Sequence, residues 1–183
     1  MRRYRCLLAA IGFLAACDSP TQPAEPPAEV FGSVTATVDG RSWTSSFFPD
    51  STIGFYSHAL GRFQITGQEV RSGPWPTLTI FLHAPPIPGA YSIGAAGAVA
   101  VAEWFQPTPS RARLQSQSSM RGFLSVAAEA DSLFIDEVDL SQRLIRGRFS
   151  FVAQEIGGMS RIAICGRFAG RLFIDGSLSS TRH

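Results

Sequence analysis

Two histidines are the main candidates for acid–base chemistry in the central part of the chain. Neither His58 nor His83 has a His, Asp or Glu partner two to four residues away, the spacing that many metal sites use. A Ser–His–Asp site could still assemble from distant positions, although the Gly-x-Ser-x-Gly elbow of the α/β-hydrolases is absent. A hydrolase that uses one of these histidines is therefore the alternative interpretation, and a protein without catalysis is the preferred one.

Four carboxylates form the densest acidic group, at Asp131, Asp136, Glu137 and Asp139. Carboxylate oxygens could hold calcium, which takes six to eight oxygen ligands. However, neighbouring residues on a strand point to opposite faces, so Asp136 and Glu137 should diverge, and the EF-hand spacing is missing. We interpret the group as a solvated strand end and expect no bound metal or other cofactor, with calcium as the weaker alternative.

The clearest chemical pattern lies near the N-terminus, where three arginines and a short apolar run precede small residues and a cysteine. This order is typical of an export signal, and the run is too short to span a hydrocarbon core of about 30 Å. Leu14, Ala15, Ala16 and Cys17 resemble the lipobox of bacterial lipoproteins position by position. The resemblance implies a signal peptide over residues 1–16, cleavage before Cys17 and acylation of that cysteine. The alternatives are an ordinary cleaved signal with a chance cysteine, or an uncleaved N-terminal anchor.

A proline-rich linker follows the cysteine, over residues 17–29. Its composition favours an extended conformation that could hold a domain up to roughly 35 Å from a bilayer, at about 3.1 Å per residue. Two or three acyl chains on Cys17 would give a stable anchor, since each buried CH₂ contributes about 0.8 kcal/mol. We expect a membrane partner through this anchor, in the bacterial cell envelope, with the choice of inner or outer membrane open.

The apparent basic character of the chain belongs to the expected signal peptide. Of 16 arginines, three precede residue 17, which leaves 13 arginines against 14 acidic residues and a mature charge of −1. This charge gives no reason to expect a nucleic-acid partner. Acylation of Cys17 would leave Cys165 as the one remaining thiol, so neither an internal disulfide nor a cysteine-based zinc site is expected. We interpret Cys165 as a small hydrophobe, and a reactive thiol is the weaker alternative.

Three aromatic residues are the best candidates for ligand binding. Trp75 lies in a loop between two prolines, and Trp104 and Phe105 lie at the end of an expected strand. Exposed aromatic rings stack on sugars and anchor protein interfaces, so a glycan or an envelope protein is the expected partner. The favoured interpretation of the rings themselves is that they cover the ends of the sandwich, and ligand binding is the leading functional alternative.

Apolar residues recur with a period of two through most of the remaining chain, which predicts β-strands. Asp39-Gly40 separates two such runs and predicts a tight hairpin, because both positions of that turn need positive φ. The expected strands cover 30–38, 41–48, 62–68, 77–83, 91–93, 99–105, 122–127, 132–138, 144–153, 161–168 and 171–175.

The run from Leu144 shows the alternation best. Ile145, Phe149 and Phe151 should point inward, while Arg146 and Arg148 point outward. No stretch has helical periodicity between good caps. We therefore predict an all-β domain over residues 30–176, an antiparallel β-sandwich of jelly-roll type with 9–11 short strands, followed by a disordered tail over 177–183. A barrel is the alternative.

The domain resembles uncharacterised bacterial lipoproteins that carry one all-β domain behind a lipobox. The likeness rests on the segment TATVDGRSW from Thr35, the segment GAYSI from Gly89, and LFI from Leu133 followed by IRGRFSF from Ile145. Arg148 departs from the small hydroxylated residue that is usual there. The resemblance implies a fold and supplies no site residues. Together these observations predict a lipid-anchored envelope protein with a non-enzymatic binding or structural domain.

Overall fold

The computed structural model describes residues 28–45, 51–69, 76–94, 98–107, 120–126 and 131–175. The expected signal peptide, the Leu14–Cys17 motif, the start of the linker, Trp75 and the C-terminal tail lie outside these ranges. Every regular element in the described ranges is a strand, which confirms the all-β class. Within them there is also no helix of the length and apolar character that crossing a membrane would require.

Eleven strands make up the described domain. Their bounds are β1 Ser33–Val38, β2 Arg41–Thr44, β3 Thr52–Ser57, β4 Arg62–Gln68, β5 Thr77–Leu82, β6 Gly89–Gly94, β7 Ala100–Pro107, β8 Met120–Ser125, β9 Ser132–Asp139, β10 Leu144–Glu155 and β11 Arg161–Asp175.

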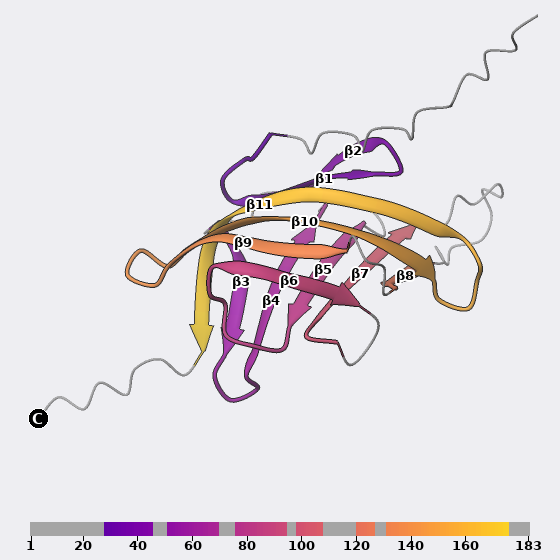
Figure 1. Cartoon of the computed structure of the whole chain (residues 1–183). Helices are drawn as coiled ribbons and strands as arrows, with labels where there is room; N and C mark the ends of the chain where they lie inside the picture. Colours follow the sequence, from indigo (N-terminus) through magenta and orange to yellow (C-terminus); the bar gives the residue numbers. More distant parts are fainter. Residues whose placement is uncertain are drawn as a thin grey trace, which may run out of the picture.

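The strands belong to one mixed sheet that closes on itself. From β11 the pairing runs through β3, β4, β5, β7, β6, β9 and β10, and the β10–β11 ladder returns it to β11. β8 pairs with both β7 and β10, and the β1–β2 hairpin pairs with β11. Two pairings are parallel, β11 with β3 and β6 with β7, so the sheet is not purely antiparallel. Figure 1 shows the long β10 and β11 arching across β3, β4, β5 and β7.

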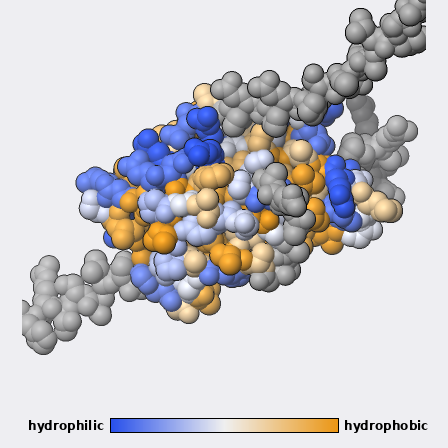
Figure 2. Space-filling view, viewed as in Figure 1, coloured by the Kyte–Doolittle hydropathy of each residue, from blue (hydrophilic) through white to orange (hydrophobic). Residues whose placement is uncertain are grey.

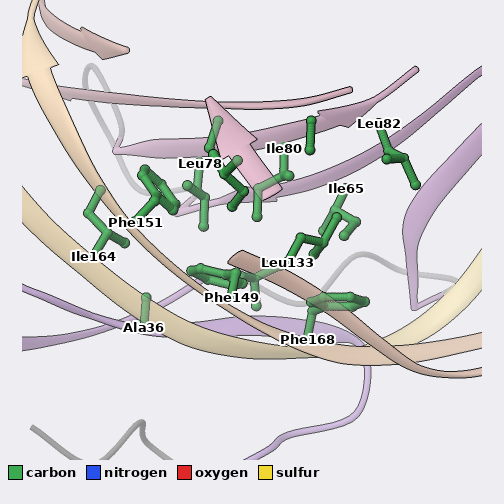
Figure 3. Packing of buried hydrophobic residues seen from close by; sticks show 14 of the residues in the cluster. Ala36, Ile65, Leu78, Ile80, Leu82, Leu133, Phe149, Phe151, Ile164 and Phe168 are labelled. Atoms are coloured by element: carbon green, nitrogen blue, oxygen red, sulfur yellow. The ribbon is translucent and has the colours of Figure 1, made fainter. Parts of the chain in front are cut away.

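The apolar core lies inside the closed sheet and follows the predicted alternation. Ile145, Phe149 and Phe151 are buried on β10, while Arg146 and Arg148 are exposed. Figure 3 shows Phe149, Phe151 and Phe168 on one side of the interior and Ile65, Leu78 and Ile80 on the other. Each fully buried Phe, Leu or Ile side chain contributes about 1.5–3 kcal/mol, so this core is the main source of stability.

The β1–β2 hairpin forms where the Asp39-Gly40 pair predicted it. Asp39 has φ 46° and Gly40 has φ 75°, the positive values that a type I′ turn requires. The turn is fastened to β11, because the Asp39 amide donates to the Ala163 carbonyl at 3.0 Å and the Ala163 amide donates to Asp39 Oδ1 at 2.9 Å. The orientation of this hairpin is therefore fixed from both sides.

The strand prediction differs from the structure at two places that are connected. The segment Thr52–Ser57 forms β3, which the sequence pattern did not predict, and the two expected strands after residue 161 form one strand, β11. β11 continues through Gly170, where a Cβ would lie 2.6 Å from the Ser51 carbonyl oxygen and 2.8 Å from Ile53 Cγ1. The glycine therefore marks a close approach of the β3 segment and not a break in the strand.

The expectation that Asp136 and Glu137 diverge is wrong, because β9 contains a bulge at this point. Glu137 pairs with Arg146 while Ile135 pairs with Gly147, so Asp136 is an extra residue. Both carboxylates consequently face outward and form ion pairs, Glu137 with Arg146 at 3.0 Å and Asp136 with Arg148 at 3.1 Å.

The surface of the domain is mixed in character. Figure 2 shows the largest group of hydrophilic residues at the upper left of the face in view, with apolar residues interspersed over the rest.

Candidate ligand-binding cleft

A cavity of about 430 Å³ opens between the tip of the β1–β2 hairpin and the end of β7. We call it the Trp43–Trp104 cleft. It is lined by Val38, Asp39, Arg41, Ser42, Trp43, Trp104 and Gln106. Alternation along the strands brings these residues together, because Val38, Arg41 and Trp43 share one face of the hairpin, and Trp104 and Gln106 share one face of β7.

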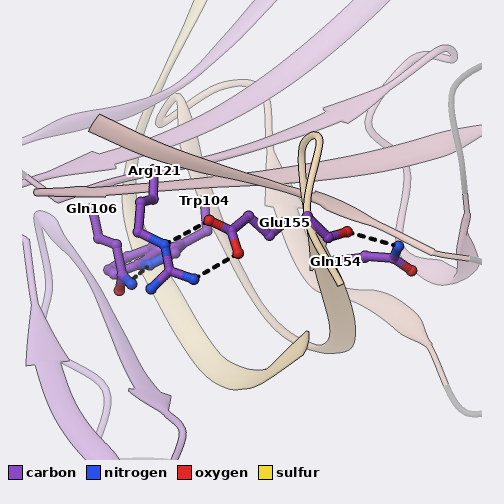
Figure 4. A network of polar contacts seen from close by, with 6 residues as sticks. Trp104, Gln106, Arg121, Gln154 and Glu155 are labelled. Atoms are coloured by element: carbon purple, nitrogen blue, oxygen red, sulfur yellow. Dashed lines mark hydrogen bonds and ion pairs between the residues drawn. The ribbon is translucent and has the colours of Figure 1, made fainter. Parts of the chain in front are cut away.

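Two indole rings form the apolar part of the cleft. Their centroids lie 5.0 Å apart with the planes at 89°, the edge-to-face geometry that aromatic pairs favour. Both residues are largely buried, since Trp43 is 9% and Trp104 is 3% exposed. Trp104 Nε1 donates to Gln106 Oε1 at 3.2 Å (Figure 4), whereas Trp43 Nε1 is buried without a hydrogen-bond partner among the described residues. Because so little of either ring is exposed, the cleft suits a small apolar group better than a flat stacking partner.

The rim of the cleft is polar. Arg41 and Ser42 are exposed at the start of β2, and Gln106 is half-buried on β7. Arg41 forms no ion pair with any residue in the described ranges, while Asp39 Oδ1 accepts the Ala163 amide. A cation without a partner beside an apolar cavity can attract a carboxylate from a ligand.

A bidentate ion pair holds the strands beside the cleft. Arg121 on β8 donates to both carboxylate oxygens of Glu155 on β10, at 2.7 Å each, and its Cζ lies 5.2 Å from the centroid of the Phe123 ring. These hydrogen bonds, with a smaller contribution from Ser160, lower the pKa of Glu155, and the same carboxylate raises the pKa of Arg121. Gln106 pairs in register with Arg121, so the ion pair supports the β7 end of the cleft (Figure 4).

The three predicted aromatic residues do not form one surface. Trp104 lines the cleft, but it is buried and is not an exposed platform. Phe105 is half-buried on the opposite face of β7, where it lies over Gly122, and Trp75 lies outside the described residues. The sequence pattern predicted Trp43 on the second strand of the hairpin but not as a site residue. Its place in that strand was the available signal, because the strand alternation puts Trp43 on the same face of the hairpin as Val38.

The histidines are not assembled into a catalytic arrangement in the part of the chain that the structure describes. The exposed His58 ring packs edge-on against Tyr56, with centroids 4.7 Å apart, and His83 is exposed at the end of β5. Neither imidazole has a hydrogen bond or ion pair to another described residue. The geometry of these ranges therefore gives the hydrolase alternative no support.

The remaining acidic residues have separate roles. Asp139 accepts hydrogen bonds from Ser141 and from the Gln142 amide in an exposed turn, and these bonds lower its pKa. Asp131 is 5% exposed; its Oδ1 accepts the Val152 amide at 3.1 Å, while Oδ2 is buried without a partner. Burial raises the pKa of Asp131. No group of three metal-ligating side chains occurs among the described residues.

Cys165 lies half-buried on β11, opposite Thr37 of β1. Burial raises the pKa of this thiol, which disfavours the reactive thiolate. The environment therefore agrees with the interpretation of Cys165 as a small packing residue.

No protein-family model, no curated protein and no solved structure matches the chain. The lipoprotein resemblance accordingly stays a prediction, and function has to be argued from the cleft itself.

Proposed function

We propose that this chain is a lipid-anchored protein of the bacterial cell envelope whose all-β domain binds a ligand, without catalysis, in the Trp43–Trp104 cleft. The cleft carries the proposal, because its volume of about 430 Å³ falls in the usual range of ligand sites, about 300–1,000 Å³. It also combines apolar indole edges with a small number of convergent polar groups, which is the composition of a site that orients a ligand.

The polar groups of the cleft are suited to binding and not to reaction. Arg41 can hold an anion, and Gln106 and Ser42 can exchange hydrogen bonds. A nucleophilic serine needs a general base within hydrogen-bond reach, and the cleft lining contains no histidine. Asp39 already accepts the Ala163 amide. These observations support a binding module that needs no cofactor.

The N-terminal residues support a location at a membrane. The resemblance of Leu14-Ala15-Ala16-Cys17 to a lipobox supports acylation at Cys17, and the linker over 17–29 supports a domain held away from the bilayer. Ligands available there include glycans and segments of envelope proteins.

We further infer that the closed sheet is a flattened β-sandwich. The strands β10 and β11 cross β3, β4, β5 and β7 in Figure 1, and apolar side chains from both groups meet between them. In orthogonal sandwiches, strands that bend or bulge pass from one layer to the other. β11 fits this role, since one of its edges pairs with β1 up to Ala169 and then with β3 from Arg171, and the β3 pairing has a register shift at Arg171/Leu172.

Binding at the cleft can be tested with intrinsic tryptophan emission, because two of the three tryptophans line it. The full chain would be titrated with short amino-sugar oligosaccharides and with random linear peptides. A ligand of the cleft should shift the emission, and Arg41→Ala should weaken its binding about tenfold. Arg171→Ala is the matched control, because this exposed arginine lies eight positions along β11 from Ala163, roughly 26 Å away. The proposal fails if bound ligands respond equally to both substitutions, or if neither class binds.

A further inference from the structure

β2 is the strand of the described sheet that has a neighbour on one side alone, namely β1. A two-residue turn makes Val38 and Arg41 a hydrogen-bonded pair, and the pattern then repeats at Ala36 with Trp43. The Ser45 amide continues it by donating to the Val34 carbonyl at 2.9 Å. The N–H and C=O groups of the intervening Ser42 and Thr44 must therefore point away from β1. Both residues are exposed, and no other described strand pairs with this edge.

The Trp43–Trp104 cleft runs beside this open edge. Three consecutive residues of β2, Arg41, Ser42 and Trp43, line it, so the cleft follows the main chain of this strand. One edge of β2 is occupied by β1. A segment paired with β2 would consequently place every second side chain over the cleft.

We propose that the occupant of this site is an extended peptide segment of a partner protein, which pairs with the free edge of β2. Its main chain would hydrogen-bond with Ser42 and Thr44, an apolar side chain would lie against the Trp43–Trp104 pair, and an acidic side chain would lie beside Arg41. The inference rests on the proposed function of the cleft and specifies the class of ligand.

Three observations favour a peptide over a sugar. Unpaired main-chain groups at alternate residues match the repeat of a second strand, and this match is the basis of recognition by strand addition. The indoles are largely buried, so little of either ring face is open for a sugar to stack on. Arg41 supplies a positive charge without a partner in the described ranges, which complements an acidic side chain.

The experiment uses linear peptides selected from a random phage-displayed library against the full chain. The best peptide is synthesised, its Kd is measured, and each amide in turn is N-methylated. Strand pairing predicts that methylation at alternate positions weakens binding about tenfold or more, while the intervening positions change it less than about twofold.

Substitutions at Ser42 provide the matched protein test. Ser42→Pro removes the outward N–H without touching the ladder to β1, and proline is tolerated on edge strands. Ser42→Ala keeps the amide. We expect the first to weaken peptide binding about tenfold and the second less than about twofold, with thermal melting of both variants as the check on folding. If Ser42→Pro does not fold, the N-methyl scan still decides the matter.

Each other outcome overturns the peptide proposal in a distinguishable way. Peptides that bind at Arg41 without an alternating methylation pattern would refute strand pairing and leave the binding function intact. Oligosaccharide binding at Arg41 with no selected peptide would make the ligand a glycan. Self-association that Ser42→Pro abolishes would make the occupant a second copy of the chain. If no probe binds the cleft, the proposed function fails as well.

Discussion

Gly147 is the position where the smallest change should have a large effect on stability. This glycine lies on β10 opposite the β9 bulge, and an added Cβ would clash with the Phe134 carbonyl oxygen and lie 2.5 Å from Phe168 Cζ. Its φ is outside the left-handed region, so Gly147→Ala introduces no backbone strain of its own. The effect of the substitution is therefore steric.

The magnitude follows from the two contacts. Carbon atoms pack best at about 3.5–4.0 Å, so the new methyl group would lie about 1 Å inside its contact with Phe168. Overpacking of this kind costs about 1–3 kcal/mol, and the upper end applies here because the Phe134 carbonyl cannot retreat without disturbing the bulge. The gain from a stiffer unfolded chain offsets about 0.4–1 kcal/mol. We expect Gly147→Ala to lower the free energy of unfolding by about 2 kcal/mol, and Tm by about 4–8 °C.

Urea and thermal unfolding of the full chain would measure this loss. Gly157→Ala is the control, because Gly157 has φ 76° and open space around it, so its variant reports left-handed strain without overpacking. A Gly147→Ala chain that melts at the wild-type temperature would refute the steric reasoning. Loss of the Glu137–Arg146 ion pair in the variant, followed by NMR, would locate the damage at the bulge.

Three further predictions concern charge and lipidation. Burial raises the pKa of Asp131 above 3.8, so the contribution of this residue to stability is present at low pH and is lost as the pH rises through the folded-state pKa. In urea titrations, Asp131→Asn should therefore gain stability relative to wild type as the pH increases. Parallel pH profiles of the two proteins would contradict this prediction. The pKa of Glu155 is lowered, so the stability that Glu155 contributes has the opposite pH dependence and is lost as the pH falls. Arg121→Ala should return this pKa toward 4.5 in an NMR titration and move acid unfolding to higher pH. An unchanged titration would show that the ion pair is ineffective. Cys17→Ser should abolish labelling by a fatty-acid probe, and continued labelling would refute the lipobox assignment.

The alternation of apolar residues was sufficient to predict most strands and their buried faces. β10 is the clearest case, since Ile145, Phe149 and Phe151 are all buried. β3 was missed because its burial does not alternate: Ile53 and Gly54 are both buried, and so are Tyr56 and Ser57. The bulge at Asp136 could not be predicted from the sequence either. The extra residue turns both carboxylates to the same face of the strand without any change in the local composition.

The cleft was predictable in part. Trp104 was identified by its type and its place at a strand end, and the Asp39-Gly40 turn correctly placed Trp43 on a hairpin strand. Their meeting depends on how β1 and β2 attach to β11, while β7 lies in another part of the sheet. Sequence periodicity gives the face of a side chain but not which strand lies opposite, so the pairing of Trp43 with Trp104 needed the structure.

The place of β11 after every other described strand in the sequence has a kinetic consequence. Ser33 pairs with Ala169, and β10 and β3 also find partners in β11, so the sheet cannot close before β11 joins it. Such non-local contacts make folding slow, because much loop-closure entropy is lost before they form. If the chain is exported as we propose, slow closure would keep it competent for threading through an export channel until β11 had crossed.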